Sequence, residues 1–212
     1  MGTIKTTNIE TITGSGTLTL GQSGETINIP SGCTITNNGT QTGFGLTGWS
    51  EDGANNNLLP ASASAGIYLG VNSATASNLL DDYEEGTWTP SFNFSSGSVG
   101  YSAQVGIYRK IGKTVHVQFA LVVNSASSPS GSTSITGLPF TSLTTGNSES
   151  SAYLGITRNL GSAHNNLRAY VNESNTVMQL PVNSTSSGFS GLPASDLQNT
   201  TQIFGNATYF TD

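Results

Sequence analysis

The sequence has very little charge, because Asp, Glu, Lys and Arg together make up only 8% of its 212 residues, against roughly 25% in a typical soluble domain. Lys and Glu are good helix formers, so their scarcity argues against a long helical bundle or a doubly wound parallel sheet. The chain also has 12 acids against 6 bases, whereas nucleic acids and anionic membranes are bound by clusters of bases. We therefore expect neither as a partner.

Cysteine is nearly absent as well: Cys33 is the single one, which argues against an intramolecular disulfide and a Cys-based metal site. Long hydrophobic runs are missing, since no stretch approaches the ~18 apolar residues that a membrane span needs. The two histidines, His116 and His164, lie far apart in the sequence and form no obvious ligand pair. We expect no metal, no cofactor and no membrane insertion.

Catalytic patterns are also missing. The sequence has no Gly-x-Ser-x-Gly elbow and no phosphate-cradling glycine-rich loop. Its one run of acids, Asp81–Glu85, suggests either the paired carboxylates of a glycosidase or a divalent-cation site. Neighbouring carboxylates in one loop are more simply explained as solvated side chains. We therefore expect no catalytic residue and no enzyme activity.

The abundant residues are small and polar: Gly, Ser, Thr and Asn account for 105 of the 212 positions. Thr suits the surface of strands, and Gly and Asn suit turns. The composition therefore predicts an all-β protein. We expect an N-terminal short-strand β-repeat of a trimeric, fibre-like kind, followed by a C-terminal antiparallel β-sandwich of jelly-roll type.

Residues 1–46 carry a weak repeat in which Ser-Gly pairs recur every eight residues, at 15–16, 23–24 and 31–32. The segments between these turns alternate like short strands. Strands of four or five residues bury too little to be stable alone, so we expect three copies to interleave as a homotrimer that attaches to a particle. A small β-meander docked on the rest of the same chain is the alternative. The predicted trimer core comprises Leu18, Leu20, Ile27, Ile29 and Ile35.

Residues 47–86 are rich in turn-forming residues and are predicted to be a linker, with one helical turn within residues 78–83. Residues 87–212 carry a strong strand signal and are predicted to form the sandwich. Its clearest element is a hairpin, in which Gly112-Lys113 forms a tight turn and apolar residues then alternate with polar ones up to Val123. Further strands are predicted at 87–94, 132–137, 151–157, 167–172, 176–182 and 200–210.

Four segments of the sandwich are expected to be loops at its outward end: 125–132, 145–150, 161–166 and 182–191. They are rich in Ser, Asn and Gly and carry almost no charge, which suits a neutral polysaccharide better than a phosphate-rich polymer. Aromatic rings rimmed by short polar side chains are also suited to sugars. The candidate glycan-binding residues are His164, Asn165, Asn166 and Phe189.

Two motifs resemble a known family of proteins. Residues 79–90 read LLDDYEEGTWTP, and residues 101–115 read YSAQVGIYRKIGKTV. Both are similar to segments of proteins from tailed bacteriophages, especially phages of aquatic bacteria such as cyanobacteria, and SGETINIPSG at 23–32 is similar to the start of such proteins. The resemblance covers roughly residues 1–123. It implies a virion structural protein of the tail-fibre or receptor-binding kind, usually a trimer, with no catalytic motif.

The chain departs from that family in being short and in lacking a long shaft. Our hypothesis is therefore a structural protein of the phage virion, located on a tail fibre or on the capsid surface. Its expected partners are other virion proteins and a host cell-surface polysaccharide. One alternative is a capsid decoration or head-fibre protein that stabilises the shell. A second is a tailspike-type glycan depolymerase, against which stands the absence of a long parallel β-helix and of a credible carboxylate pair.

Overall fold

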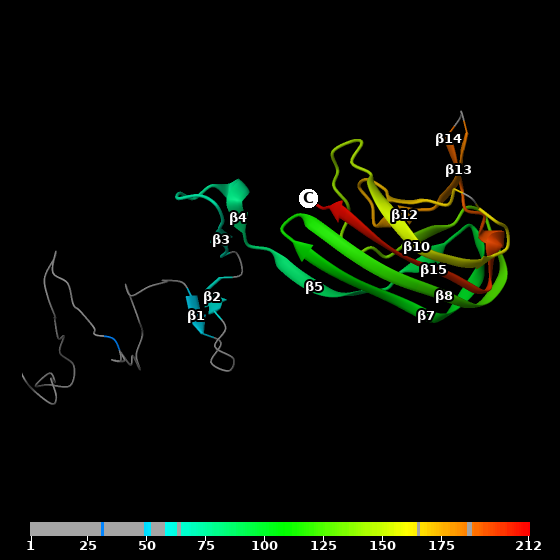
Figure 1. Ribbon diagram of the computed structural model, residues 1–212, viewed down its shortest axis with the longest axis horizontal. Helices are drawn as coiled ribbons and strands as arrows, with labels where there is room; N and C mark the ends of the chain where they lie inside the picture. The colour runs from blue at the N-terminus through cyan, green and yellow to red at the C-terminus, as the bar shows by residue number, and fades with distance from the viewer. Residues whose placement is uncertain (1–30, 32–48, 52–57, 63–64, 165, 186–187) are drawn as a thin grey trace, which may run out of the picture. The chain divides into compact units, whose positions relative to one another are not determined.

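The computed structural model describes residues 31, 49–51, 58–62, 65–164, 166–185 and 188–212 (Figure 1). The chain divides into two units, Met1–Thr47 and Gly48–Asp212. Apart from Ser31, the first unit lies outside the described residues, and so do the predicted β-repeat and its trimer core of Leu18, Leu20, Ile27, Ile29 and Ile35. Those expectations stay predictions.

The second unit begins with short elements. β1 (Trp49–Glu51) pairs antiparallel with β2 (Leu58–Pro60), and β3 (Ile67–Tyr68) pairs antiparallel with β4 (Leu79–Leu80). The 3-10 turn η1 (Ala76–Asn78) precedes β4. The helical turn predicted for residues 78–83 is therefore wrong in position, because Leu79 and Leu80 pair with β3 instead. Among the described residues, no helix is long and apolar enough to cross a membrane.

The rest of this unit is dominated by one nine-stranded antiparallel sheet, which confirms the predicted all-β class. Across the sheet, the strands follow the order β5-β7-β8-β15-β10-β11-β12-β9-β6. Their bounds are β5 Tyr83–Trp88, β6 Ser91–Asn93, β7 Ser96–Ile111, β8 Thr114–Ser130, β9 Ser134–Thr136, β10 Ser150–Leu160, β11 Ala169–Val171, β12 Val177–Gln179 and β15 Leu197–Phe210. A separate hairpin, β13 (Pro181–Thr185) with β14 (Gly188–Gly191), and the 3-10 turn η2 (Ala194–Asp196) lie between β12 and β15 in sequence.

The long hairpin of β7 and β8 follows the predicted pattern. Gly112 has a φ of +54° in the turn between the two strands, a conformation that glycine adopts without strain. On β8, alternate residues from Val115 to Val123 are at most 3% exposed, whereas His116 and Gln118 between them are exposed. The period of two therefore gives the sheet one buried face and one open face.

The sheet is curled over, so that its two edge strands come together. β5 and β6 lie at opposite edges, yet only Thr89 and Pro90 separate them in sequence, and such a link spans at most ~11 Å. Tyr101 Oη of β7 accepts a hydrogen bond from the Phe92 N–H of β6 at 2.8 Å, and Gln104 Nε2 donates to Pro90 O at 2.8 Å. The single strand predicted at 87–94 is thus two strands, because proline lacks the N–H that a continuous ladder needs.

The core fills the space that this curl encloses. Phe119 of β8 and Ile203 of β15 belong to the same buried cluster as Ile135 of β9 and Met178 of β12. The edge of the Trp88 ring packs on Phe119, with ring centroids 6.1 Å apart. Side chains from strands far apart in the sheet order therefore meet in one core.

β15 occupies the centre of the sheet although it comes last in the sequence. It pairs with β8 on one side, from Gln202 opposite Val122 to Phe210 opposite Thr114, and with β10 on the other. Its inward-facing residues include Tyr209, which is 1% exposed. The C-terminal strand thus joins the β7–β8 hairpin to the rest of the sheet.

Candidate functional site

The sheet has two ends that differ in construction. At the turn end lie the Gly112-Lys113 turn and the start of β5, where the Gly112 N–H donates to Asp82 O at 2.7 Å. The opposite end, here called the loop end, is where β8 finishes and β15 starts. Figure 1 shows β5 entering the sheet at one end, and the β13–β14 hairpin and η2 at the other.

Three of the four segments predicted as loops meet at the loop end, but two of them are mostly strand: β8 continues through 125–132 as far as Ser130, and 182–191 belongs to the β13–β14 hairpin. The Ala194 N–H of η2 donates to Gly131 O at 2.8 Å, and the Gly161 N–H donates to Asp196 O at 2.8 Å. Pro181 of β13 pairs with Gly191 of β14 just before η2. These contacts bring together the segments 125–132, 161–166 and 182–191.

The fourth predicted loop, 145–150, lies at the turn end, so its assignment to the outward end is wrong. The Leu143 N–H donates to Phe210 O at 2.8 Å, and Thr144 Oγ1 donates to Asp212 Oδ2 at 2.8 Å. The segment therefore begins beside the last residues of β15. Its composition matches that of the other three segments. It lies at the turn end because β10, which starts at Ser150, runs from the turn end to the loop end.

The predicted candidate His164 is largely buried. Its side chain is 11% exposed, and Nε2 lies 2.6 Å from Oδ2 of Asp196, whose side chain is 10% exposed. Ser162 Oγ donates to the other carboxylate oxygen of Asp196 at 3.0 Å. Asp196 thus fixes the shape of the loop that follows β10. No sequence pattern indicates this role, because Asp196 stands 32 residues from His164 and outside the acidic run.

The other predicted glycan contacts are described only in part. Asn166 is exposed beside the loop that His164 anchors. Asn165 and the Phe189 side chain lie outside the described part of the chain. Their role in binding stays a prediction.

A hollow of about 410 Å³ opens beside η2 at the loop end. The Ala126 N–H donates to Asn199 Oδ1 at 2.8 Å, and Gln198 Nε2 donates to Ser195 O at 2.9 Å, so both carboxamides are held in place. Such a concavity suits a ligand with hydroxyl groups and no charge. Its lining has no charged residue and consists of Ala126, Ser128, Pro129, Ser195, Leu197, Gln198 and Asn199.

The backbone around this hollow is strained at two positions. Ser128 has a φ of +46°, and Thr200, next to Asn199, has a φ of +80°. Left-handed backbone is rare for a β-branched residue such as Thr and costs of order 1–3 kcal/mol. Asn159 Nδ2 donates to Thr200 O at 3.1 Å and helps to hold this conformation, and strained backbone often occurs at functional sites.

The turn end carries the acidic run, which is part of a strand and not of a solvated loop. Most of the run lies in β5, which pairs with β7. The hydrogen bond from Arg109 holds the pKa of Glu85 below its ordinary value. No group of three or more His, Cys, Asp or Glu side chains that could hold a metal ion is found among the described residues. The matched pairs are Asp82 with Lys110, Glu84 with Tyr108, and Glu85 with Arg109.

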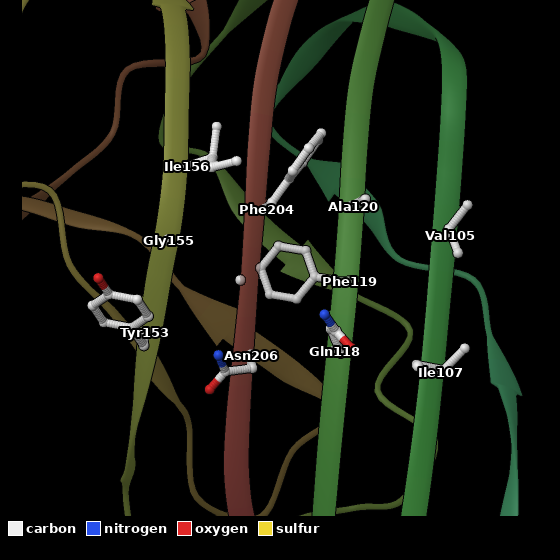
Figure 2. A pocket seen from close by; sticks show the side chains of 11 residues that line it. Val105, Ile107, Gln118, Phe119, Ala120, Tyr153, Gly155, Ile156, Phe204 and Asn206 are labelled. Carbon is white, nitrogen blue, oxygen red and sulfur yellow. The ribbon is translucent and has the colours of Figure 1, made fainter.

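A second hollow, of about 490 Å³, lies on the open face of the sheet and crosses β7, β8, β15 and β10 (Figure 2). Val105, Ile107 and Tyr153 line it and are 54%, 49% and 67% exposed. Between them, Gln118 of β8 stands opposite Asn206 of β15. None of the described residues predicted from the sequence as site residues lies on this face, because alternation predicts only that the face is open.

No known family model and no curated protein matches the chain. Among solved structures, the chain resembles the crystal structure of the Dettilon tailspike protein (gp208), with a TM-score of 0.51 and 21% sequence identity. The match covers 60% of this chain and 24% of that chain. A structural neighbour is thus a phage tailspike protein. At this identity the likeness shows a shared fold, and it carries no information on an aquatic host.

Proposed function

We propose that the protein is a structural protein of a phage virion, a homotrimer that binds a neutral host-surface polysaccharide with the loop end of its sheet. The fold likeness to a phage tailspike protein supports the virion assignment. The uncharged hollow beside η2 is the observation that carries the binding assignment. Residues 1–46 attach the trimer to other virion proteins.

The chemistry of the hollow favours a neutral sugar over a phosphate-rich polymer. Hydroxyl and carboxamide groups donate to and accept from sugar hydroxyls, whereas phosphates are bound chiefly by Arg and Lys, and neither lines this hollow. Asn166 is exposed at the same end of the sheet, beside the loop whose shape the bond between His164 and Asp196 fixes, and we propose it as a further contact. Asn165 and Phe189 stay candidates from the sequence. A millimolar site contributes about −4 kcal/mol, so three linked copies gain useful avidity.

Filling the hollow tests this proposal. Ser195 is exposed and lines the hollow, so Ser195→Trp places an indole where the sugar binds. Ser127 is also exposed but does not line the hollow, so Ser127→Trp is the matched control. On an array of neutral and phosphate-bearing bacterial polysaccharides, we expect wild type and Ser127→Trp to bind a neutral glycan. We expect Ser195→Trp to bind it at least tenfold more weakly.

A loop replacement provides a second comparison of the two ends. Gly-Ser segments in place of 161–166 should abolish glycan binding, whereas the same replacement of 145–150 at the turn end should leave binding intact. Equal losses in both variants contradict the assignment of binding to the loop end. Binding to phosphate-bearing polymers alone contradicts the neutral ligand.

The two alternatives predict different observations. A decoration protein is present in hundreds of copies per particle, coats capsids and binds no glycan, so quantitative mass spectrometry of purified particles separates it from a fibre. A depolymerase releases oligosaccharides from the glycan that it binds. We expect no release, and release by wild type that is lost on alanine substitution at Asp81, Asp82, Glu84 and Glu85 contradicts the non-enzymatic proposal.

A further inference from the structure

The open side of β5, β7, β8, β15 and β10, here called the outer face, carries an unusual concentration of apolar side chains. Within the described nine-stranded sheet, every large hydrophobic residue that is exposed lies on this face. A monomer seldom leaves an apolar patch of this size in water. The residues, between 48% and 67% exposed, are Tyr83, Val105, Ile107, Ile111, Tyr153 and Phe210.

The strand register gathers these side chains into two groups. At the turn end, Tyr83 lies opposite Ile111, and Phe210 completes the same row across β8. In the middle of the face, Val105 and Ile107 flank the hollow from β7 and Tyr153 flanks it from β10, as Figure 2 shows. The two groups are about 13 Å apart along the strands, because one polar row lies between them.

The polar row is internally neutralised. Arg109 Nη2 lies 3.0 Å from Glu85 Oε2, and His116 Nδ1 lies 3.0 Å from Thr208 Oγ1. The Arg109 guanidinium of this row is therefore already paired with an acid, and His116 is paired with a hydroxyl. An anionic polymer therefore finds no unpaired base to bind in this row. The same face of a second copy meets no net charge there, although the whole chain carries −6.

The size of the outer face matches what a stable association needs. Five strands ~4.8 Å apart and nine residues of ~3.3 Å each make a surface on the order of 700 Å² before side-chain relief is added. Stable protein interfaces bury about 800 Å² on each partner. A small sugar covers only part of such an area, and a flat protein surface covers most of it.

We infer that the outer face is covered by other copies of this chain. The inference deepens the homotrimer proposed above and rests on it. Three sheets meet through their apolar rows, with the pairs of Glu85 and Arg109 set between them. Because the loop end lies at the tips of the strands and not on this face, the glycan hollow stays open in the assembly.

Chemical labelling of the full chain tests which face is covered. In a background with Cys33→Ser, Gln118→Cys places a thiol in the centre of the outer face, and Asn93→Cys places one at an exposed position of β6. In the oligomer we expect maleimide to label Gln118→Cys at least tenfold more slowly than Asn93→Cys. After dilution has dissociated the oligomer, the two rates should converge. Light scattering reports the oligomeric state of each sample.

Charge insertion provides the matched pair of variants. Ile107→Glu on the outer face should raise the concentration at which the oligomer dissociates by at least tenfold. Ile67→Glu, on β3 and of similar exposure, should leave it unchanged. Both side chains are about half exposed in one chain, so circular dichroism should show both variants folded.

The outcomes separate this inference from the proposed function. An oligomer in which Gln118→Cys reacts as fast as Asn93→Cys overturns the covered face and leaves both the homotrimer and glycan binding standing. A protein that stays monomeric at about 50 µM, a concentration at which mass action favours assembly, overturns the inference and the homotrimer together. If a neutral oligosaccharide protects Gln118→Cys from maleimide in a monomer, the outer face is a sugar site and the inference is overturned. The polysaccharide array tests binding at the loop end independently.

Discussion

The two ends of the sheet are built from different chemistry. The turn end carries ion pairs that are open to solvent, such as Arg109 with Glu85, whose side chains are 58% and 54% exposed. The loop end has its pair inside: His164 and Asp196 are 11% and 10% exposed. The exposed pair of Arg109 and Glu85 is therefore expendable for folding, although the turn end also holds Lys110, whose side chain is only 11% exposed and pairs with Asp82. The buried pair at the loop end shapes the surface that surrounds it.

The largest effect should follow from breaking the buried pair. Asp196→Ala leaves His164 Nε2 and the Ser162 hydroxyl without their acceptor, which we expect to lower the free energy of unfolding by about 3 kcal/mol. Urea unfolding measures this change. The double variant with His164→Ala gives the coupling between the two residues. A loss below about 1 kcal/mol contradicts a shaping role for Asp196.

A smaller effect should appear at the turn end on raising the pH. Burial raises the pKa of Tyr209 to about 12, and its Oη donates to Phe140 O at 3.0 Å. An unfolded tyrosine titrates near pH 10, so the folded state favours the neutral phenol. This contribution is complete below pH 10 and is lost as the pH rises to 12, which amounts to about 2–3 kcal/mol.

Tyr209→Phe is the control for that titration. It removes the ionisable group at a cost of about 1 kcal/mol at pH 7 from the lost hydrogen bonds, and its stability should fall less steeply between pH 10 and 12. A shallow slope remains, because burial also raises the pKa of Tyr101. Identical slopes in wild type and variant would show that Tyr209 is not the group that titrates.

The smallest effect should come from an exposed pair at the turn end. Glu85→Gln removes the partner of Arg109, and we expect no measurable change in Tm of the isolated chain at 0.15 M salt. Because the pKa of Glu85 is lowered in the folded state, any stabilisation of the folded state by this pair is present above pH 4.5. It disappears as the pH falls below that value. A clear drop in Tm, measured by calorimetry, would contradict the expectation that the exposed pair contributes much less to stability than the buried pair at the loop end.

Local patterns made much of the fold predictable from the sequence. The Gly112-Lys113 turn and the alternation up to Val123 follow from short-range chemistry, and the strands at 132–137, 151–157 and 200–210 overlap β9, β10 and β15. The break at Pro90 also has a local cause, since proline ends a ladder. Residues 87–94 are predicted as a single strand because Trp88 and Phe92, which lie on either side of Pro90, are both strand-forming residues.

Long-range pairing was not predictable in the same way. Nothing near Asp196 in the sequence marks it as the partner of His164, and the segment 145–150 has the composition of the loops at the other end. The acids of β5 resembled a solvated run because their partners lie more than twenty residues away on β7. Which residues meet across a sheet depends on strand order, and composition does not encode strand order.

The central place of β15 has a consequence for how the chain is made. A ribosome synthesises β5 to β12 before β15, yet the β7–β8 hairpin has no neighbour on its second side until Leu197 to Phe210 have emerged. Sheets that depend on such distant pairings fold slowly. A chain that stops before residue 197 lacks the strand that pairs with both β8 and β10, so we expect truncated products to stay incompletely folded and open to proteases.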